Sequence, residues 1–146
     1  MKIGISSFVW VSPFNTNNID ILYKAKEYGY DLFEIAVEDA ALIDLKKVKN
    51  VAREIGLELS VSGAFGPERD ISSDNLAYRK IGLSYIKDCI RIANELESPV
   101  FGGPLYSAVG KTRLVSKEQK QLERQYCIEN LFEATNYAQE MGVVLA

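Results

Sequence analysis

Glu34 is the residue whose setting most strongly suggests chemistry. It interrupts residues 31–37, a nearly continuous apolar run that is typical of a strand. A carboxylate is costly to bury unless it is hydrogen-bonded or paired with a cation. We therefore predict that Glu34 faces inward near the end of its strand and orients a polar substrate or a neighbouring group. The alternative is a charge on the helix side of the sheet, satisfied by a lysine such as Lys26.

Two loops rich in small residues follow later strand-like segments. The first, residues 62–67, reads S-G-A-F-G-P, and the second, residues 102–107, reads G-G-P-L-Y-S. Small residues leave room for a ligand against the backbone, although each loop could also be an ordinary turn. Two such loops after consecutive strands support a binding site more strongly than either alone.

Aromatic and charged residues near these loops are further candidates. Trp10 and Phe14 follow the first predicted strand, and an aromatic wall beside a polar floor is common in sugar sites. Packing in the core or in a lid is the alternative for both. Residues 68–70 are expected to form a solvated charge cluster. Lys111 and Arg113 are expected in a solvated loop, with contact to an anionic substrate as the alternative.

The composition excludes several classes of function. The chain has 146 residues, a formal net charge of −3 and no histidine, so it contains no Ser-His-Asp triad and no Cys-His pair. Without a basic stripe, nucleic-acid binding has no electrostatic support. No stretch approaches the roughly 20 apolar residues of a membrane span, and the start lacks a signal-peptide core, so we expect a cytoplasmic protein. Cys89 and Cys127 are expected to be free thiols on helices.

Four strand–helix units followed by the opening of a fifth strand must position these residues. The expected strands cover residues 2–10, 31–37, 57–62 and 100–102, with a fifth opening in 142–146. The expected helices begin at Asn17 or Asn18, at Asp44, at Ser72 or Ser73, and at Ser116.

This alternation predicts an α/β fold with a parallel sheet and right-handed crossovers. The spacing is near the ~30 residues per unit of an eight-fold barrel, whose active site lies in the loops after the strands. Here those loops are long, whereas the turns before strands are short and contain Gly29, Gly56 and Gly142. A doubly wound open sheet is the alternative, but no glycine fingerprint for phosphate follows the first strand.

The order of several short motifs resembles a known family. These motifs are residues 1–5 with Trp10, residues 29–35, Gly66-Pro67 with residues 71–73, and residues 102–107. Together they resemble the ketose 3-epimerases of the D-tagatose and D-psicose 3-epimerase type. That family belongs to the sugar phosphate isomerase/epimerase superfamily with xylose-isomerase-like barrels. The resemblance implies a (β/α)8 TIM barrel, of which residues 1–146 are the amino-terminal half of a single domain.

The resemblance also implies a reaction and a cofactor. In this family a proton leaves C3 of a free ketose and returns on the other face through an enediolate, assisted by divalent manganese, magnesium or cobalt. Two glutamates act as acid and base and bind the metal with an aspartate and a histidine. Family members carry these ligands on strands five to eight. We therefore expect no catalytic or metal-binding residue in this chain, with the first glutamate just after Ala146 and no activity for the chain alone.

What carries over from the resemblance is a substrate-binding wall. The matching positions are Ser6, Trp10, Phe14, Glu34, Gly63, Ala64, Gly66, Pro104, Tyr106 and Ser107. Position 6 is often aromatic or histidine in the family, so Ser6 leaves the substrate open. The expected partner is a small-molecule sugar, and a homo-oligomer, a dimer or a tetramer, is expected.

Other readings of the sequence remain. Related sugar enzymes such as a hydroxypyruvate isomerase or an inosose dehydratase fit the same motifs. A zinc enzyme like endonuclease IV fits less well, because its histidines would begin in this half. A non-catalytic sugar-binding half-barrel that dimerises through its open sheet edges is a different class of function.

Overall fold

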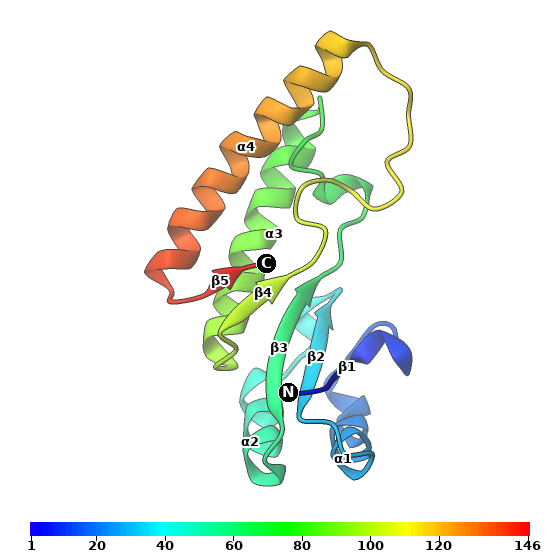
Figure 1. The fold of residues 1–146 in the computed structure, drawn as a ribbon, viewed down its shortest axis with the longest axis vertical. Coiled ribbons are helices and arrows are strands. Elements are labelled where there is room, and N and C mark those ends of the chain that lie inside the picture. The colour runs from blue at the N-terminus through cyan, green and yellow to red at the C-terminus, as the bar shows by residue number, and fades with distance from the viewer.

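A single sheet of five parallel strands, in chain order β1-β2-β3-β4-β5, organises the computed structural model, which describes residues 1–146 (Figure 1). The strands are β1 (Gly4–Ser6), β2 (Leu32–Val37), β3 (Glu58–Gly63), β4 (Val100–Gly102) and β5 (Val144–Leu145). The helices are α1 (Asp20–Glu27), α2 (Leu45–Ile55), α3 (Leu76–Glu95) and α4 (Lys117–Glu140). Short 3₁₀ turns are η1 (Ser7–Val9), η2 (Thr16–Asn18), η3 (Ala40–Leu42) and η4 (Pro67–Arg69).

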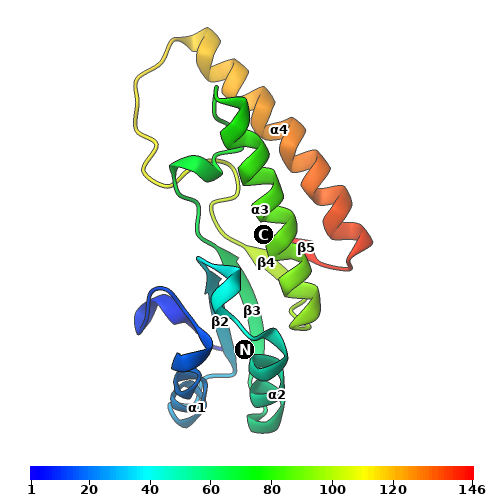
Figure 2. The same ribbon diagram turned by 180° about the vertical axis from the view of Figure 1, so that it is seen from behind.

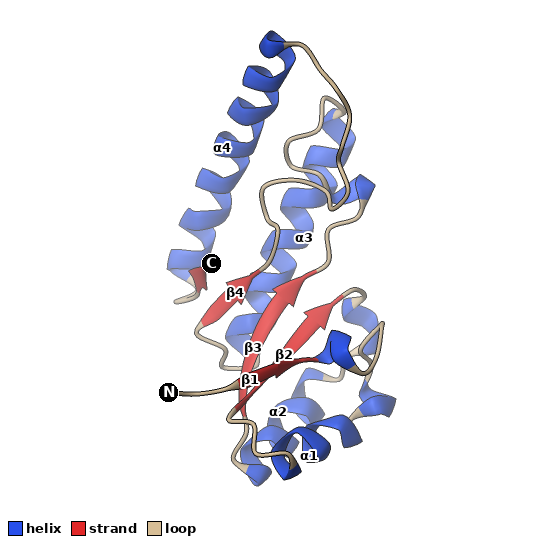
Figure 3. Ribbon diagram, turned by 45° about the vertical axis from the view of Figure 1, so that its right-hand side comes forward, coloured by secondary structure: helices blue, strands red, loops and turns tan.

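The helices lie together behind the sheet, as Figures 2 and 3 show from two directions. Each neighbouring pair of strands is parallel, and each is joined through one helix. A doubly wound sheet would reverse its strand order and carry helices on both faces. The arrangement is instead that of about half a (β/α)8 barrel, which confirms the predicted fold class.

The register of the strands gives the sheet two chemically different faces. Side chains paired across parallel strands point to the same side, and successive residues alternate. Ile35, Val61 and Phe101 form one row, and all three are fully buried against the helices. We call this side the outer face. Ser6, Glu34 and Ser60 form a row on the opposite side, which we call the inner face.

Helix boundaries follow local capping chemistry at most of the predicted positions. The Asp44 side chain accepts a hydrogen bond from the Lys47 amide, and the Ser116 side chain accepts one from the Gln119 amide, as predicted. Gly56 ends α2 with a φ of 64°, a left-handed conformation that suits glycine. Cys89 and Cys127 are both free thiols on helices.

Three predicted boundaries were wrong, each because a short polar side chain found another partner. The first helix begins at Asp20 after η2, which is capped by Asn15 instead of Asn17 or Asn18. The first strand stops at Ser6, because Ser7 turns its hydroxyl inward to accept a hydrogen bond from the Ala36 amide.

The third wrong boundary is the start of α3. Asn75 caps this helix by accepting a hydrogen bond from the Ala77 amide. Ser72 and Ser73 instead lie buried in the β3–α3 loop, where the Ser72 hydroxyl donates to Asp70 and the Ser73 hydroxyl accepts from the Asn75 amide.

None of the helices is both long and apolar enough to cross a membrane.

Candidate functional site

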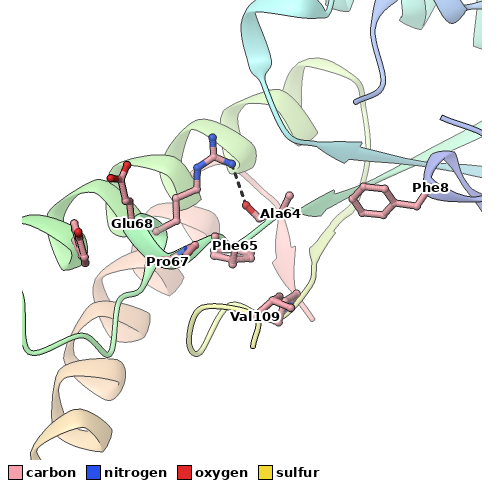
Figure 4. Close-up of a pocket in the computed structure, with 11 residues that line it drawn as sticks. Phe8, Ala64, Phe65, Pro67, Glu68 and Val109 are labelled. Atoms are coloured by element: carbon pink, nitrogen blue, oxygen red, sulfur yellow. Dashed lines mark hydrogen bonds between the residues drawn. The ribbon is translucent and has the colours of Figure 1, made fainter. Parts of the chain in front are cut away.

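An open cavity of about 840 Å³ lies at the carboxyl ends of β3 and β4 (Figure 4). In a βα barrel this end of the strands carries the active site. Phe8 stands at one end of the cavity and Glu68 at the other. The lining residues are Phe8, Gly63, Ala64, Phe65, Gly66, Pro67, Glu68, Arg69, Tyr78, Pro104 and Val109. Four of the sequence-predicted residues are among them: Gly63, Ala64, Gly66 and Pro104.

The small residues of the β3–α3 loop serve two different purposes. A Cβ at Gly63 would lie 2.5 Å from the ring of Phe65 and 3.1 Å from that of Phe101, so glycine is required there by packing. A Cβ at Gly66 would meet nothing within 4 Å. Room beside the cavity is therefore found at Gly66, whereas the space above Gly63 is already filled by Phe65.

Arg69 and Tyr85 tie the carboxyl ends of β2 and β3 together. The Arg69 guanidinium donates to the carbonyls of Ala64 and Glu38, both at 2.9 Å, and lies 3.9 Å from the centre of the Tyr85 ring. The Tyr85 hydroxyl accepts from the Ala64 amide at 2.7 Å and donates to the Val37 carbonyl. Burial raises the pKa of Tyr85, so the phenol keeps its proton for that bond.

The inner face holds polar groups that have no partner in the chain. The Ser6 hydroxyl oxygen is buried and makes no hydrogen bond. Glu34, half-buried beside it in the register, makes no ion pair or side-chain hydrogen bond. Lys26, the alternative partner, donates to the Gly56 carbonyl at 2.7 Å instead. The prediction that Glu34 faces inward is therefore confirmed, but Glu34 is the third of six residues in β2 and not near the end of the strand. Its role stays a prediction.

Trp10 and Phe14 lie in the apolar layer instead of along the cavity. Phe14 is 1% exposed, and its ring centre is 6.1 Å from that of Phe33 on the outer face. The half-buried Trp10 stacks on Phe33 at 6.4 Å, with the Lys24 ammonium 4.9 Å from its ring centre. The structure therefore places both residues in the packing position, and their contact with a sugar stays a prediction.

Tyr106 and Ser107 line a neighbouring cavity of about 490 Å³, between the β4–α4 loop and the start of α4. Tyr106 is largely exposed, and Ser107 is half-buried. Neither residue lines the cavity at the ends of β3 and β4, and their contact with a sugar also stays a prediction.

The expected solvation of Asp70 and Lys111 was wrong. The side chains of Asp70, Lys111 and Glu123 are only 6%, 17% and 13% exposed, because they neutralise one another. The Lys111 ammonium lies 2.9 Å from Asp70 Oδ2 and 3.0 Å from Glu123 Oε2. Burial pushes the pKa of Asp70 upward, but hydrogen bonds from Ser72 and Lys111 outweigh it and lower that pKa. Arg113, by contrast, is about half exposed and pairs with Asp74 and Glu123.

The residues of this chain do not fit a divalent metal. Nowhere in residues 1–146 do three or more histidine, cysteine, aspartate or glutamate side chains gather as a possible ligand set. Catalytic metals are usually held by at least three such groups.

Sequence reasoning missed several cavity residues. Phe65 and Pro67 belong to the loop already singled out, so their position in it was a usable signal. Phe8, Tyr78 and Val109 come from η1, α3 and the β4–α4 loop. Only the folded chain brings these three segments together, and no local pattern marks them.

Comparison with known proteins identifies relatives of this arrangement. The family described as xylose isomerase-like TIM barrel matches residues 22–146. A ketose 3-epimerase from Arthrobacter globiformis is 32% identical over 112 residues, which are 76% of this chain and 39% of that protein. A D-psicose 3-epimerase from Ruminiclostridium cellulolyticum is 24% identical over 98% of this chain and 50% of its own length.

Solved structures of similar fold include two epimerases. An L-ribulose 3-epimerase superposes with a TM-score of 0.87 at 24% identity, over 99% of this chain and 48% of that one. A D-allulose 3-epimerase from Methylomonas sp. superposes with a TM-score of 0.89 at 21% identity, over 99% of this chain and 50% of that one. The chain spans half or less of the length of the curated relatives that it matches.

Proposed function

The chain belongs to the xylose isomerase-like TIM barrel family, and on that premise we propose that the whole protein is a sugar epimerase acting at C3 of a free ketose. Within it, residues 1–146 form the amino-terminal half of one barrel domain and supply a wall of the sugar site. We further propose a cytoplasmic homo-oligomer.

The inner face of the sheet carries this proposal. Barrel interiors are usually filled by branched apolar side chains. Here the row across β1, β2 and β3 is Ser6, Glu34 and Ser60, and the Ser6 hydroxyl is buried without a partner. Buried polar groups are nearly always hydrogen-bonded, so a polar ligand or a further polar segment must complete this row. A sugar, with a hydroxyl on almost every carbon, has the matching chemistry.

The cavity at the carboxyl ends of β3 and β4 supports the same ligand class. Phe8, Pro104 and Val109 offer apolar surface that suits the C–H face of a sugar. Glu34, half-buried and without a partner in the chain, would hydrogen-bond sugar hydroxyls and fix the orientation of the ketose. In this proposal the chain binds and orients its substrate.

The proton transfer at C3 needs residues that we do not assign within 1–146. An epimerase of this type removes the proton through an enediolate, and the resemblance implies divalent manganese, magnesium or cobalt. No ligand set for that metal exists among the described residues. We propose that both the metal site and the acid–base pair come from a further part of the protein, since the curated relatives extend well beyond the matched region.

An epimerisation assay tests the proposal. The full-length gene product, supplied with manganese, is expected to convert D-fructose or D-tagatose into its C3 epimer, and in deuterated water to place deuterium at C3. Residues 1–146 expressed alone are expected to give no turnover. Absence of C3 epimerisation by the full-length protein on every ketose tried would refute the activity. Robust turnover by residues 1–146 would refute the proposal that the metal site and the acid–base pair come from a further part of the protein.

A second candidate is a non-catalytic half-barrel that pairs with another copy. In its favour, β1 pairs only with β2 and β5 pairs only with β4, so both edges of the sheet are open. Light scattering on residues 1–146 distinguishes the two. A monomer excludes closure by dimerisation, whereas a dimer that binds a ketose without turnover supports it.

A further inference from the structure

The β4–α4 loop, residues 103–116, is long and contains no helix or strand, yet it forms part of the cavity wall. Pro104 and Val109 line the cavity from this loop. Apart from the bond that joins Ser116 to the first turn of α4, its only backbone hydrogen bond to another segment runs from the Val109 amide to the Phe65 carbonyl, at 2.9 Å. One such bond is little to hold a loop of this length, so side chains must supply the rest.

Lys111 is the most buried charged side chain of this loop and has an acceptor for each of its three N–H bonds. Its ammonium lies 2.9 Å from Asp70 Oδ2, 3.0 Å from Glu123 Oε2 and 2.8 Å from Ser72 Oγ. A lysine ammonium has three donors and no acceptor, so this set satisfies it completely. The Ser72 hydroxyl in turn donates to Asp70 at 2.7 Å, which closes the network.

The three acceptors come from two other segments. Asp70 and Ser72 belong to the β3–α3 loop, whose residues 64–69 form most of the cavity wall, and Glu123 belongs to α4. The β3–α3 loop packs closely against α3 at this point, because a Cβ on Gly82 of α3 would lie 2.8 Å from the Arg69 carbonyl. Lys111 thus joins the β4–α4 loop to the β3–α3 loop and to α4.

We propose that Lys111 is a positioning residue for the sugar site. Its ammonium holds the β4–α4 loop against the β3–α3 loop, so that Pro104 and Val109 stand along the cavity before a ligand enters. Preorganisation of this kind strengthens binding by removing the entropic cost of ordering the loop. The role of Lys111 in holding the loop does not depend on the proposed function. Only the assumption that the ligand is a ketose rests on that function.

Hydrogen exchange at the Val109 amide, measured without sugar, tests whether Lys111 holds the β4–α4 loop against the β3–α3 loop. Lys111→Met is expected to speed exchange there about tenfold, since the local opening becomes easier. In the full-length protein the same variant is expected to raise KM for the ketose about tenfold and to leave kcat within about twofold. Lys111→Arg keeps the charge and is expected to recover most of both effects.

Two further variants separate positioning from general destabilisation. Lys111→Met combined with Asp70→Asn and Glu123→Gln also removes the buried carboxylates that Lys111 neutralised, and it should fold while still showing fast exchange at Val109. Lys49→Met is the matched control: Lys49 pairs with Glu97 at 3.2 Å and donates to the Glu95 carbonyl, away from both loops. It is expected to change Tm without changing exchange at Val109 or KM.

The outcomes are distinguishable. Faster exchange without a higher KM, a higher KM without faster exchange, or equal effects from Lys49→Met would each overturn the positioning role. If the wild-type protein epimerises no ketose, the proposed function fails, and exchange at Val109 alone then decides whether Lys111 seats the loop.

Discussion

The two faces of one sheet are built for different purposes, although they alternate residue by residue along the same strands. Phe101 on the outer face is fully buried, and its neighbour Gly102 lies on the inner face. Ile35 is fully buried, and its neighbour Glu34 is a carboxylate without a partner. The outer face supplies free energy of folding through apolar burial, whereas the inner face carries polar groups that have no partner in the chain.

The largest expected effect is on the outer face. Phe101→Ala should lower the free energy of unfolding by about 3–5 kcal/mol, because it empties a fully packed site beside Val61. Val100→Ala, one residue away on the inner face and only half-buried, should cost about 1 kcal/mol. Urea denaturation of residues 1–146 measures both, and equal losses would show that the inner face is packed like the outer one.

A smaller loss of stability is expected at the carboxyl ends of β2 and β3, where the Tyr85 hydroxyl joins the two strands. Tyr85→Phe leaves the Ala64 amide and the Val37 carbonyl without their partner, at a cost of about 1–3 kcal/mol. Tyr28→Phe is the control, since that hydroxyl makes no hydrogen bond and the ring is 62% exposed. Thermal unfolding compares the two, and similar Tm values would mean that the tie formed by Tyr85 contributes nothing.

Ser6 and Ser7 are neighbouring serines that should respond in opposite directions. The Ser7 hydroxyl accepts from the Ala36 amide at 3.0 Å, so Ser7→Ala should destabilise the protein by about 1–3 kcal/mol. The Ser6 hydroxyl is buried without a partner, so Ser6→Ala should be neutral or stabilising by about 1 kcal/mol. Destabilisation by Ser6→Ala in the sugar-free protein would show that this hydroxyl has a structural partner after all.

Glu34 should show almost no effect on stability and a clear one on binding. Because its carboxylate has no partner in the chain, Glu34→Gln should change the free energy of unfolding by less than about 0.5 kcal/mol. Loss of a hydrogen bond between a charged group and a sugar hydroxyl should weaken ketose binding about tenfold in the full-length protein.

Glu58→Gln provides the control for that measurement. Glu58 lies on the inner face, as Glu34 does, but at the amino end of β3, and its carboxylate pairs with the Lys2 ammonium at 2.5 Å. It should leave ketose affinity unchanged in isothermal titration, and equal losses from the two variants would argue against a specific role for Glu34.

Local patterns in the sequence were sufficient for the order of elements and for most helix ends. The alternation of strands and helices gave the parallel sheet, and Asp44, Gly56 and Ser116 marked boundaries that the structure confirms. Each of these signals acts within a few residues, through a cap or a turn, so no distant contact can change it. The small-residue loops likewise marked the cavity at Gly66 and Pro104.

The sequence could not decide which side chains meet. Trp10 looked like a binding wall and lies against Phe33, while Asp70 and Lys111 looked solvated and lie buried together. Asp70 and Lys111 are 41 residues apart in the sequence and meet only when the chain folds. Local periodicity does not encode such a contact. The sequence by itself determined the alternation that makes two faces. Only the tertiary structure decided which polar groups would find partners and which, like Ser6 and Glu34, would be left without one on the inner face.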